Sequence, residues 1–123
     1  MKYELSQRFY FEAAHTLRRK IDAEGSLRIH GHTYHAEVTI AGTPDPASGM
    51  MMDLAFLRQE VEKVREKLDH HFLDEVPGLG PATLENLCAF IYNDLKASLP
   101  HIHCITIERP ASGDTCRLMP HEK

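Results

Sequence analysis

The chain has 123 residues, of which 42% are hydrophobic and 26% charged, and its formal net charge is −4. These values fit one globular domain over residues 1–123 and exclude the disordered and membrane-embedded classes of protein. The acidic excess argues against a nucleic-acid partner, which usually demands a basic surplus. No apolar run has the length of a signal peptide or a membrane span, so we expect no membrane partner.

The cysteines and histidines narrow the question further. Three cysteines, an odd number without C-x-x-C spacing, predict buried free thiols and a reducing, cytoplasmic location. Nine histidines are the compositional exception, so the functional site is sought among them. A basic run, Arg18-Arg19-Lys20, predicts a solvated loop or a patch that attracts an anionic small molecule.

The first two predicted elements are strands. Residues 3–15 alternate between apolar and polar side chains, with aromatic residues on the apolar side, which is typical of a half-buried strand. A second alternating strand runs from about residue 32, or from His30 if it begins early, to residue 40. Residues 42–46, with the prolines at 44 and 46, end it because proline cannot donate to a ladder.

Two helices and two short strands follow. Asp53 is the expected N-cap of a helix whose apolar residues repeat at three and four positions up to Leu68. Thr83 is the expected N-cap of a second helix, which ends before Pro100. Strands at about 103–108 and 115–119 are joined by a turn at 112–114.

The element order ββααββ predicts an α+β fold, in which two helices cover one face of a four-stranded antiparallel sheet. A single helical layer leaves the other face of the sheet open to water. Oligomerisation is the simplest way to cover that face.

The histidines near the ends of the first two strands predict a metal site. Residues i and i+2 of a strand point to the same face, so His30 and His32 share one face. If the two strands are antiparallel neighbours, His15 lies beside them. Three imidazoles favour a zinc site with a free fourth position, with Gly31 allowing a close backbone fit. The alternative is a turn with exposed histidines. His35 is an odd number of residues from His30 and His32, so its side chain points to the other face of the strand and it is not a ligand candidate.

Two further candidates carry carboxylates. Asp69 and His70 end the first predicted helix, where a histidine can simply complement the helix dipole. An adjacent aspartate and histidine can also form a proton relay. Glu108 lies on a strand face that we expect it to share with Ile102 and Thr106. A carboxylate there needs either an arginine or a cationic, guanidine-like edge of a ligand.

In these residues the chain resembles the 6-pyruvoyl tetrahydropterin synthases and the related 6-carboxy tetrahydropterin synthases of queuosine biosynthesis. The resemblance covers nearly the whole chain. It rests on motifs that occur in the family's order, namely Phe11-Glu12-Ala13-Ala14-His15, His30-Gly31-His32, Gly49-Met50-Met51-Met52-Asp53-Leu54, Leu68-Asp69-His70-His71-Phe72-Leu73, Pro81-Ala82-Thr83-Leu84-Glu85-Asn86 and Glu108.

The resemblance implies a tunnelling fold, whose subunits form trimers or dimers of trimers that close a β-barrel, with the active site at a subunit interface. It implies a pterin substrate, 7,8-dihydroneopterin triphosphate, and a lyase reaction. It also implies the roles of the site residues: zinc at His15, His30 and His32, proton transfer by Asp69 and His70, and substrate binding by Glu108, Thr83 and Glu85.

The chain departs from this family at one position. These synthases typically carry a catalytic cysteine four residues before the first histidine of the His-Gly-His motif, and Ser26 stands there. A serine hydroxyl is a poorer base than a thiolate unless a neighbour activates it. Glu24 is nearby, two residues out of register. Two alternatives therefore remain, a divergent enzyme with aldolase-like side-chain cleavage that uses Glu24 or His70, and a zinc- and pterin-binding protein without catalysis.

Overall fold

The computed structural model describes residues 1–16 and 28–121. Its elements are β1 (Tyr3–His15), β2 (His30–Gly42), α2 (Leu54–Leu68), the short 3-10 helix η1 (Leu73–Glu75), α3 (Leu84–Leu95), β3 (Ile102–Arg109) and β4 (Asp114–Leu118). The four strands form one antiparallel sheet in the order β1-β2-β3-β4. The predicted ββααββ order and α+β class are confirmed, with η1 as an addition.

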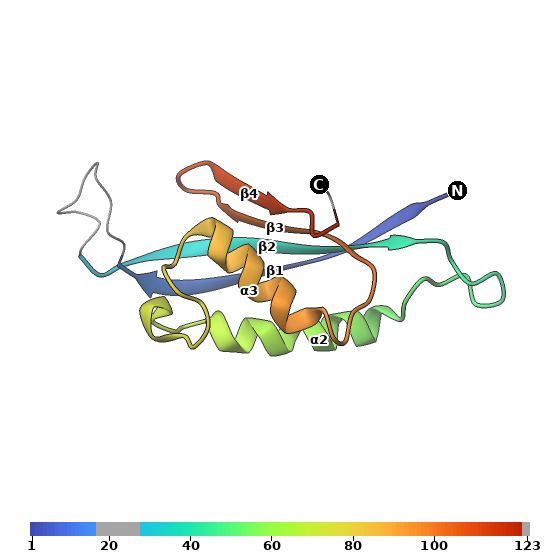
Figure 1. Cartoon of the computed structure of the whole chain (residues 1–123), viewed down its shortest axis with the longest axis horizontal. Helices are drawn as coiled ribbons and strands as arrows, with labels where there is room; N and C mark the ends of the chain where they lie inside the picture. Colours follow the sequence, from blue (N-terminus) through green and yellow to red (C-terminus); the bar gives the residue numbers. More distant parts are fainter. Residues whose placement is uncertain (17–27, 122–123) are drawn as a thin grey trace.

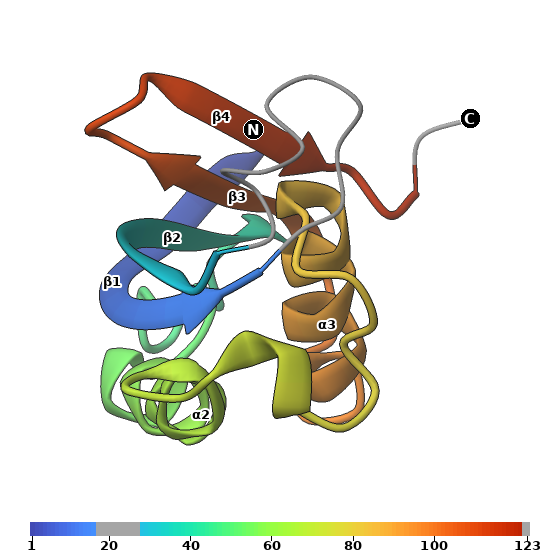
Figure 2. The same cartoon turned by 90° about the vertical axis from the view of Figure 1, so that its left-hand side faces the viewer.

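Both helices lie on the same side of the sheet (Figures 1 and 2). Helix α2 packs against β1, and α3 packs against β3 and β4. Between these layers lies a continuous apolar core that includes Phe11, Tyr34, Leu57, Ile91 and Ile107. Burying a side chain of this size contributes roughly 1.5–3 kcal/mol, so the helix-covered face carries most of the stability of the fold.

The predicted caps begin both helices. The Asp53 carboxylate accepts the backbone N–H of Ala55 at 2.8 Å at the start of α2. The Thr83 hydroxyl accepts the backbone N–H of Asn86 at 3.1 Å at the start of α3. Each cap satisfies a backbone donor that the first helical turn leaves without a partner.

A register shift in the middle of the sheet corrects one expectation. Thr39 pairs with Cys104, but the next residue of β2, Ile40, pairs with Ile102. The extra residue, His103, therefore reverses the side-chain alternation at the start of β3. Ile102 is buried in the core and does not share the face of Glu108, as alternation through a regular strand had indicated.

The structure also bears on the cysteines and on the length of the helices. Of the three free cysteines, Cys88 is buried, whereas Cys104 and Cys116 are half-buried, so the expectation of buried thiols was wrong for two of them. Within residues 1–16 and 28–121, the helices are too short or too polar to cross a membrane.

Candidate functional site

Three histidines converge at one end of the sheet, on the side that the helices cover. In the antiparallel register His15 lies opposite His30, and His32 lies opposite Ala13. One potential ligand atom from each histidine lies within 4.8 Å of the others. We call His15, His30 and His32 the histidine cluster. The convergence that strand parity predicts is confirmed, and this arrangement can hold a metal ion.

The environment of the cluster suits neutral imidazoles. His15 is 1% exposed, and neither of its ring nitrogens has a hydrogen-bond partner among the described residues. Burial, and then the neighbouring His30, lower the pKa of His15. The Nδ1 of His30 lies 2.8 Å from the carbonyl oxygen of Arg28, which favours a proton on Nδ1 and leaves Nε2 as a lone-pair donor. Buried imidazole nitrogens without protein partners are the donors that a transition metal takes.

Aromatic side chains close the inner side of the cluster. The ring of Tyr34 meets the ring of His32 edge-on at 5.7 Å and stacks on Phe11 at 4.9 Å. Tyr34 is fully buried, and burial raises its pKa to about 12. A ligand therefore reaches the cluster from the sheet end and not through the core.

Two neighbours of the cluster do not belong to it. His35 is exposed on the opposite sheet face, as its parity predicted. A Cβ atom added at Gly31 would meet the carbonyl oxygen of Ala13 at 3.6 Å, which is an ordinary contact. The single chain therefore does not require glycine at this position, and the expectation of a close backbone approach at Gly31 was wrong.

Asp69 and His70 form a pair at the end of α2. The Nδ1 of His70 lies 2.9 Å from Oδ2 of Asp69. The other carboxylate oxygen, Oδ1, accepts the backbone N–H of Glu12 at 2.9 Å. That hydrogen bond above all, together with His70 and Arg65, holds the pKa of Asp69 below its usual value against the opposing effect of burial. The carboxylate is 16% exposed, whereas the imidazole is 77% exposed. Asp69 thus stays ionised and orients a solvent-facing imidazole.

The segment from Asp69 to Asp74 runs along the outer edge of β1, and we call it the edge segment. His70 has a left-handed φ of 59° and donates its N–H to the carbonyl oxygen of Glu12 at 2.6 Å. Further along, Ala14 and Phe72 form an isolated parallel bridge. Asp74 then accepts the backbone N–H of Thr16 at 2.9 Å and also its hydroxyl. These contacts fix the register between the Asp69–His70 pair and the end of β1.

One hollow adjoins both His70 of this pair and His32 of the histidine cluster. It has a volume of about 510 Å³ and is lined by His32, His70, Glu12 and Gly31, among others. His32 of the cluster and His70 of the pair are both among the residues that line this hollow. The fold therefore brings together residues from β1, β2 and the end of α2.

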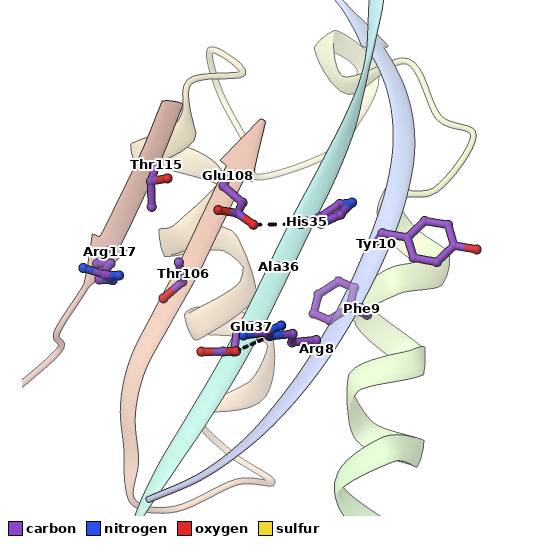
Figure 3. Close-up of a pocket in the computed structure, with 10 residues that line it drawn as sticks. All are labelled: Arg8, Phe9, Tyr10, His35, Ala36, Glu37, Thr106, Glu108, Thr115 and Arg117. Atoms are coloured by element: carbon purple, nitrogen blue, oxygen red, sulfur yellow. Dashed lines mark hydrogen bonds and ion pairs between the residues drawn. The ribbon is translucent and has the colours of Figure 1, made fainter. Parts of the chain in front are cut away.

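Glu108 lies on the opposite, helix-free face of the sheet. Figure 3 shows it directed toward His35, and the two side chains approach within 3.9 Å. The partner of Glu108 is thus a histidine and not an arginine; Arg8 pairs instead with Glu37 at 2.6 Å. These residues line a hollow of about 480 Å³ together with Thr106 and Arg117. A single chain does not bring Glu108 to the same sheet face as the histidine cluster.

The remaining predicted site residues divide into two groups. Thr83 and Glu85 lie at the start of α3, where the Thr83 hydroxyl serves as the helix cap. Ser26 and Glu24 lie outside the described residues, as does the basic run 18–20. Cys88 is no substitute for a catalytic thiol, because it lies in the core and burial raises the pKa of its thiol.

Sequence reasoning missed Arg65 and Asp74, which hold the edge segment in place. Arg65 contacts Asp69 from one helical turn earlier, and the i, i+4 spacing of opposite charges was a readable signal. Asp74 gave no such signal, because its partner Thr16 is 58 residues away in the chain.

Comparison with known proteins gives a consistent family assignment. The profile of the 6-pyruvoyl tetrahydropterin synthase family matches residues 4–118. A 6-pyruvoyl tetrahydrobiopterin synthase of Homo sapiens is 36% identical over 111 residues, which cover 79% of this chain and 77% of the human protein. A 6-carboxy-5,6,7,8-tetrahydropterin synthase of Synechocystis is 34% identical over 106 residues, which cover 80% of each chain.

Solved structures agree with the sequence comparison. The 6-pyruvoyl tetrahydropterin synthase of Caenorhabditis elegans superposes with a TM-score of 0.83 at 28% identity, covering 97% of this chain and 96% of that one. A Plasmodium vivax 6-pyruvoyltetrahydropterin synthase superposes with a TM-score of 0.71 at 20% identity, covering 97% of this chain and 99% of that one. That protein is altered at a glutamate described as a catalytic residue. At this identity the likeness shows the fold alone. The fold class is thus the tunnelling fold, and the chain belongs to the 6-pyruvoyl tetrahydropterin synthase family.

Proposed function

We propose that this protein is a zinc-dependent lyase that acts on 7,8-dihydroneopterin triphosphate and yields a 6-pyruvoyl- or 6-carboxy-tetrahydropterin. The family assignment supports a pterin-processing lyase. The observation that carries the proposal is the hollow of about 510 Å³ that His32 and His70 both line. His32 belongs to the proposed metal-binding cluster, and His70 is the proposed proton-transfer group.

His15, His30 and His32 would hold the zinc ion. The unpartnered, buried nitrogens of His15 and the Nδ1 contact of His30 support this assignment. When bound, zinc supplies a Lewis acid that polarises the side-chain oxygens of the pterin and makes the adjacent carbons more acidic.

The Asp69–His70 pair is the proposed proton-transfer group. A carboxylate can only accept hydrogen bonds, so Nδ1 of His70 carries the proton in this pair. The exposed Nε2 is then free to take up or release a proton. Asp69 itself does not change its protonation, because its pKa is lowered.

Ser26 and Glu24 are the proposed candidates for the base that removes a proton from the substrate side chain. A serine hydroxyl needs activation to act as a base, whereas a carboxylate is ionised at neutral pH. The Plasmodium vivax enzyme offers a chemical precedent, because a glutamate is described as a catalytic residue of that protein. Glu24 is therefore the first of the two to test.

Glu108, Thr83 and Glu85 complete the proposal as substrate-binding residues. Glu108 would bind the guanidine-like edge of the pterin. Since it lies on the other sheet face from the histidine cluster, we propose a homo-oligomer, a trimer or a dimer of trimers, in which a second copy of the chain completes the site.

We further propose that residues 1–123 form one domain, that the protein is cytoplasmic, and that it binds no nucleic acid or membrane.

The proposal is tested by incubating the purified protein with 7,8-dihydroneopterin triphosphate and identifying the products by mass spectrometry. We expect a 6-pyruvoyl or a 6-carboxy product, loss of turnover in His70→Ala, and a large loss in Glu24→Gln. His103→Ala is the matched control, because His103 pairs with Glu4 at 3.2 Å, far from the cluster in the register of β3. Unaltered turnover in His70→Ala would contradict the relay.

Ser26 favours two other candidate functions. A product cleaved to a 6-hydroxymethylpterin would indicate aldolase-like side-chain cleavage. If the wild-type protein binds pterin and zinc without turnover, and Ser26→Cys restores turnover, the protein is a binding member of the family that has lost catalysis.

A further inference from the structure

Arg65 lies between the end of α2, the edge of β1 and the Asp69–His70 pair. Its Nε donates to the carbonyl oxygen of Tyr10 at 2.8 Å. One terminal nitrogen lies 3.2 Å from Oδ2 of Asp69, and the other lies 3.3 Å from Glu62. The guanidinium also lies 5.7 Å from the centre of the Tyr10 ring. These four contacts hold the arginine, which is 28% exposed, in one orientation.

The contact with Asp69 falls on the oxygen that also holds His70. Oδ2 lies 3.2 Å from Arg65 and 2.9 Å from Nδ1 of His70, while Oδ1 accepts the N–H of Glu12. With both oxygens engaged, the carboxylate cannot turn about its Cβ–Cγ bond without losing a hydrogen bond. The plane of the carboxylate, and with it the direction of the lone pair offered to His70, depends on Arg65 and on the backbone of β1.

We propose that Arg65 is a positioning residue, which fixes the Asp69 carboxylate so that His70 keeps its proton on Nδ1 and presents an unprotonated Nε2 to the hollow shared with His32. This inference rests on the proposed role of His70 in proton transfer. The guanidinium suits the task, because its planar fork contacts a backbone carbonyl and a carboxylate from one rigid group. Lysine offers the same charge as a single point and lacks the fork.

The exposed ring of His70 needs a contact that fixes its orientation. His70 is one of two non-glycine residues with a positive φ among the described residues, and its side chain is 77% exposed. Packing therefore does little to fix the ring, and the 2.9 Å contact between its Nδ1 and Oδ2 of Asp69 is the interaction that orients it. A rotated carboxylate would release the imidazole to either tautomer.

The test reads the tautomer of His70 by long-range ¹H–¹⁵N NMR of neutral, metal-free protein at about pH 8.5, roughly two units above an ordinary histidine pKa. In the wild type we expect the proton on Nδ1. In Arg65→Gln we expect a loss of that preference, as in Asp69→Asn, and an intermediate result in Arg65→Lys. Glu62→Gln, which removes the charge of the other carboxylate that contacts Arg65, is the matched control and should leave the tautomer unchanged.

His71 supplies an internal reference in the same spectra. Its Nδ1 lies 2.8 Å from the backbone carbonyl oxygen of Asp69, a contact that does not involve the Asp69 side chain. Its tautomer should therefore stay constant in Arg65→Gln. A parallel change in both histidines would mean that the end of α2 has unravelled, and would overturn the specific role of Arg65.

Kinetics give the second readout. Arg65→Gln should lower kcat by roughly tenfold and change KM by less than about twofold, because misplacing a proton-transfer group affects the transition state more than substrate binding. An unchanged His70 tautomer in Arg65→Gln or, if that variant does not fold, in Arg65→Lys would overturn the proposal, whatever happens to stability. If the wild type shows no turnover, the proposed function fails, and the NMR result still decides the role of Arg65.

Discussion

Oδ1 of Asp69 accepts a hydrogen bond from the backbone N–H of Glu12 at 2.9 Å, although 57 residues separate them in the chain. The contact joins the end of α2 to the edge of β1 beside the histidine cluster. It also links the protonation of Asp69 to folding, because a carboxylate that accepts hydrogen bonds only in the folded state has a lowered pKa there.

This linkage predicts a pH-dependent stability difference between the wild type and Asp69→Asn. Since the folded-state pKa is depressed, the stabilisation is complete above the unfolded value of about 3.9 and is lost as the pH falls through the folded value. Urea unfolding of both metal-free proteins from about pH 7 to about pH 3 should give a free-energy gap that is constant near neutral pH and shrinks in acid. A gap that stays constant over the whole range would contradict the linkage.

Removal of one member of the histidine cluster should abolish tight zinc binding. His32→Ala leaves two imidazoles, and we expect its zinc affinity to fall by more than about 100-fold, beyond the loss typical of altering a group that only orients a ligand. His35→Ala is the matched control, because His35 lies on the same strand but on the opposite face. Competition with a chromogenic chelator measures both affinities. Equal affinities in the two variants would exclude the proposed metal ligands.

Substitution of Glu108 should weaken pterin binding and leave zinc in place. Loss of a charge-assisted contact costs about 1.5–3 kcal/mol, or roughly ten- to hundredfold in affinity, so we expect that decrease for Glu108→Gln in calorimetric titration with neopterin. Glu37→Gln is the control, since Glu37 shares the sheet face but pairs with Arg8 at 2.6 Å. Wild-type affinity in Glu108→Gln would remove Glu108 from the site.

Thr83 should show a structural role that is separable from any contact with substrate. Its hydroxyl caps α3, so Thr83→Ala should lose about 1 kcal/mol of unfolding free energy, whereas Thr83→Ser keeps the cap and most of the stability. Asp53→Ala, which removes the cap of α2, should cost a similar amount. Chemical denaturation measures all three. No loss in Thr83→Ala would show that the cap contributes nothing to stability.

The histidine cluster was predictable because it depends on local rules alone. Strand alternation places His30 and His32 on one face, and antiparallel pairing of neighbouring strands brings His15 beside them. The helix starts were predictable for the same reason, since Asp53 and Thr83 cap the turns that directly follow them. These features require no knowledge of how distant elements pack.

The features that sequence reasoning missed depend on tertiary contacts. The extra residue His103 reverses the alternation of β3, and nothing in its local pattern marks the shift. The edge segment lies along β1 because Asp69 and Asp74 meet backbone groups nearly sixty residues away. Likewise, alternation grouped Glu108 with Thr106 but did not show that the histidine cluster lies on the other face of the sheet.

X-ray absorption spectroscopy at the zinc edge of the purified, zinc-loaded protein tests the proposed metal site most directly. We expect three imidazole nitrogens at about 2.0–2.1 Å and a fourth, light ligand from solvent. Loss of one imidazole in His32→Ala, but not in His35→Ala, would assign the ligands to the histidine cluster. A sulfur ligand at about 2.3 Å, or fewer than three imidazoles in the wild type, would contradict the central claim that His15, His30 and His32 form the metal site.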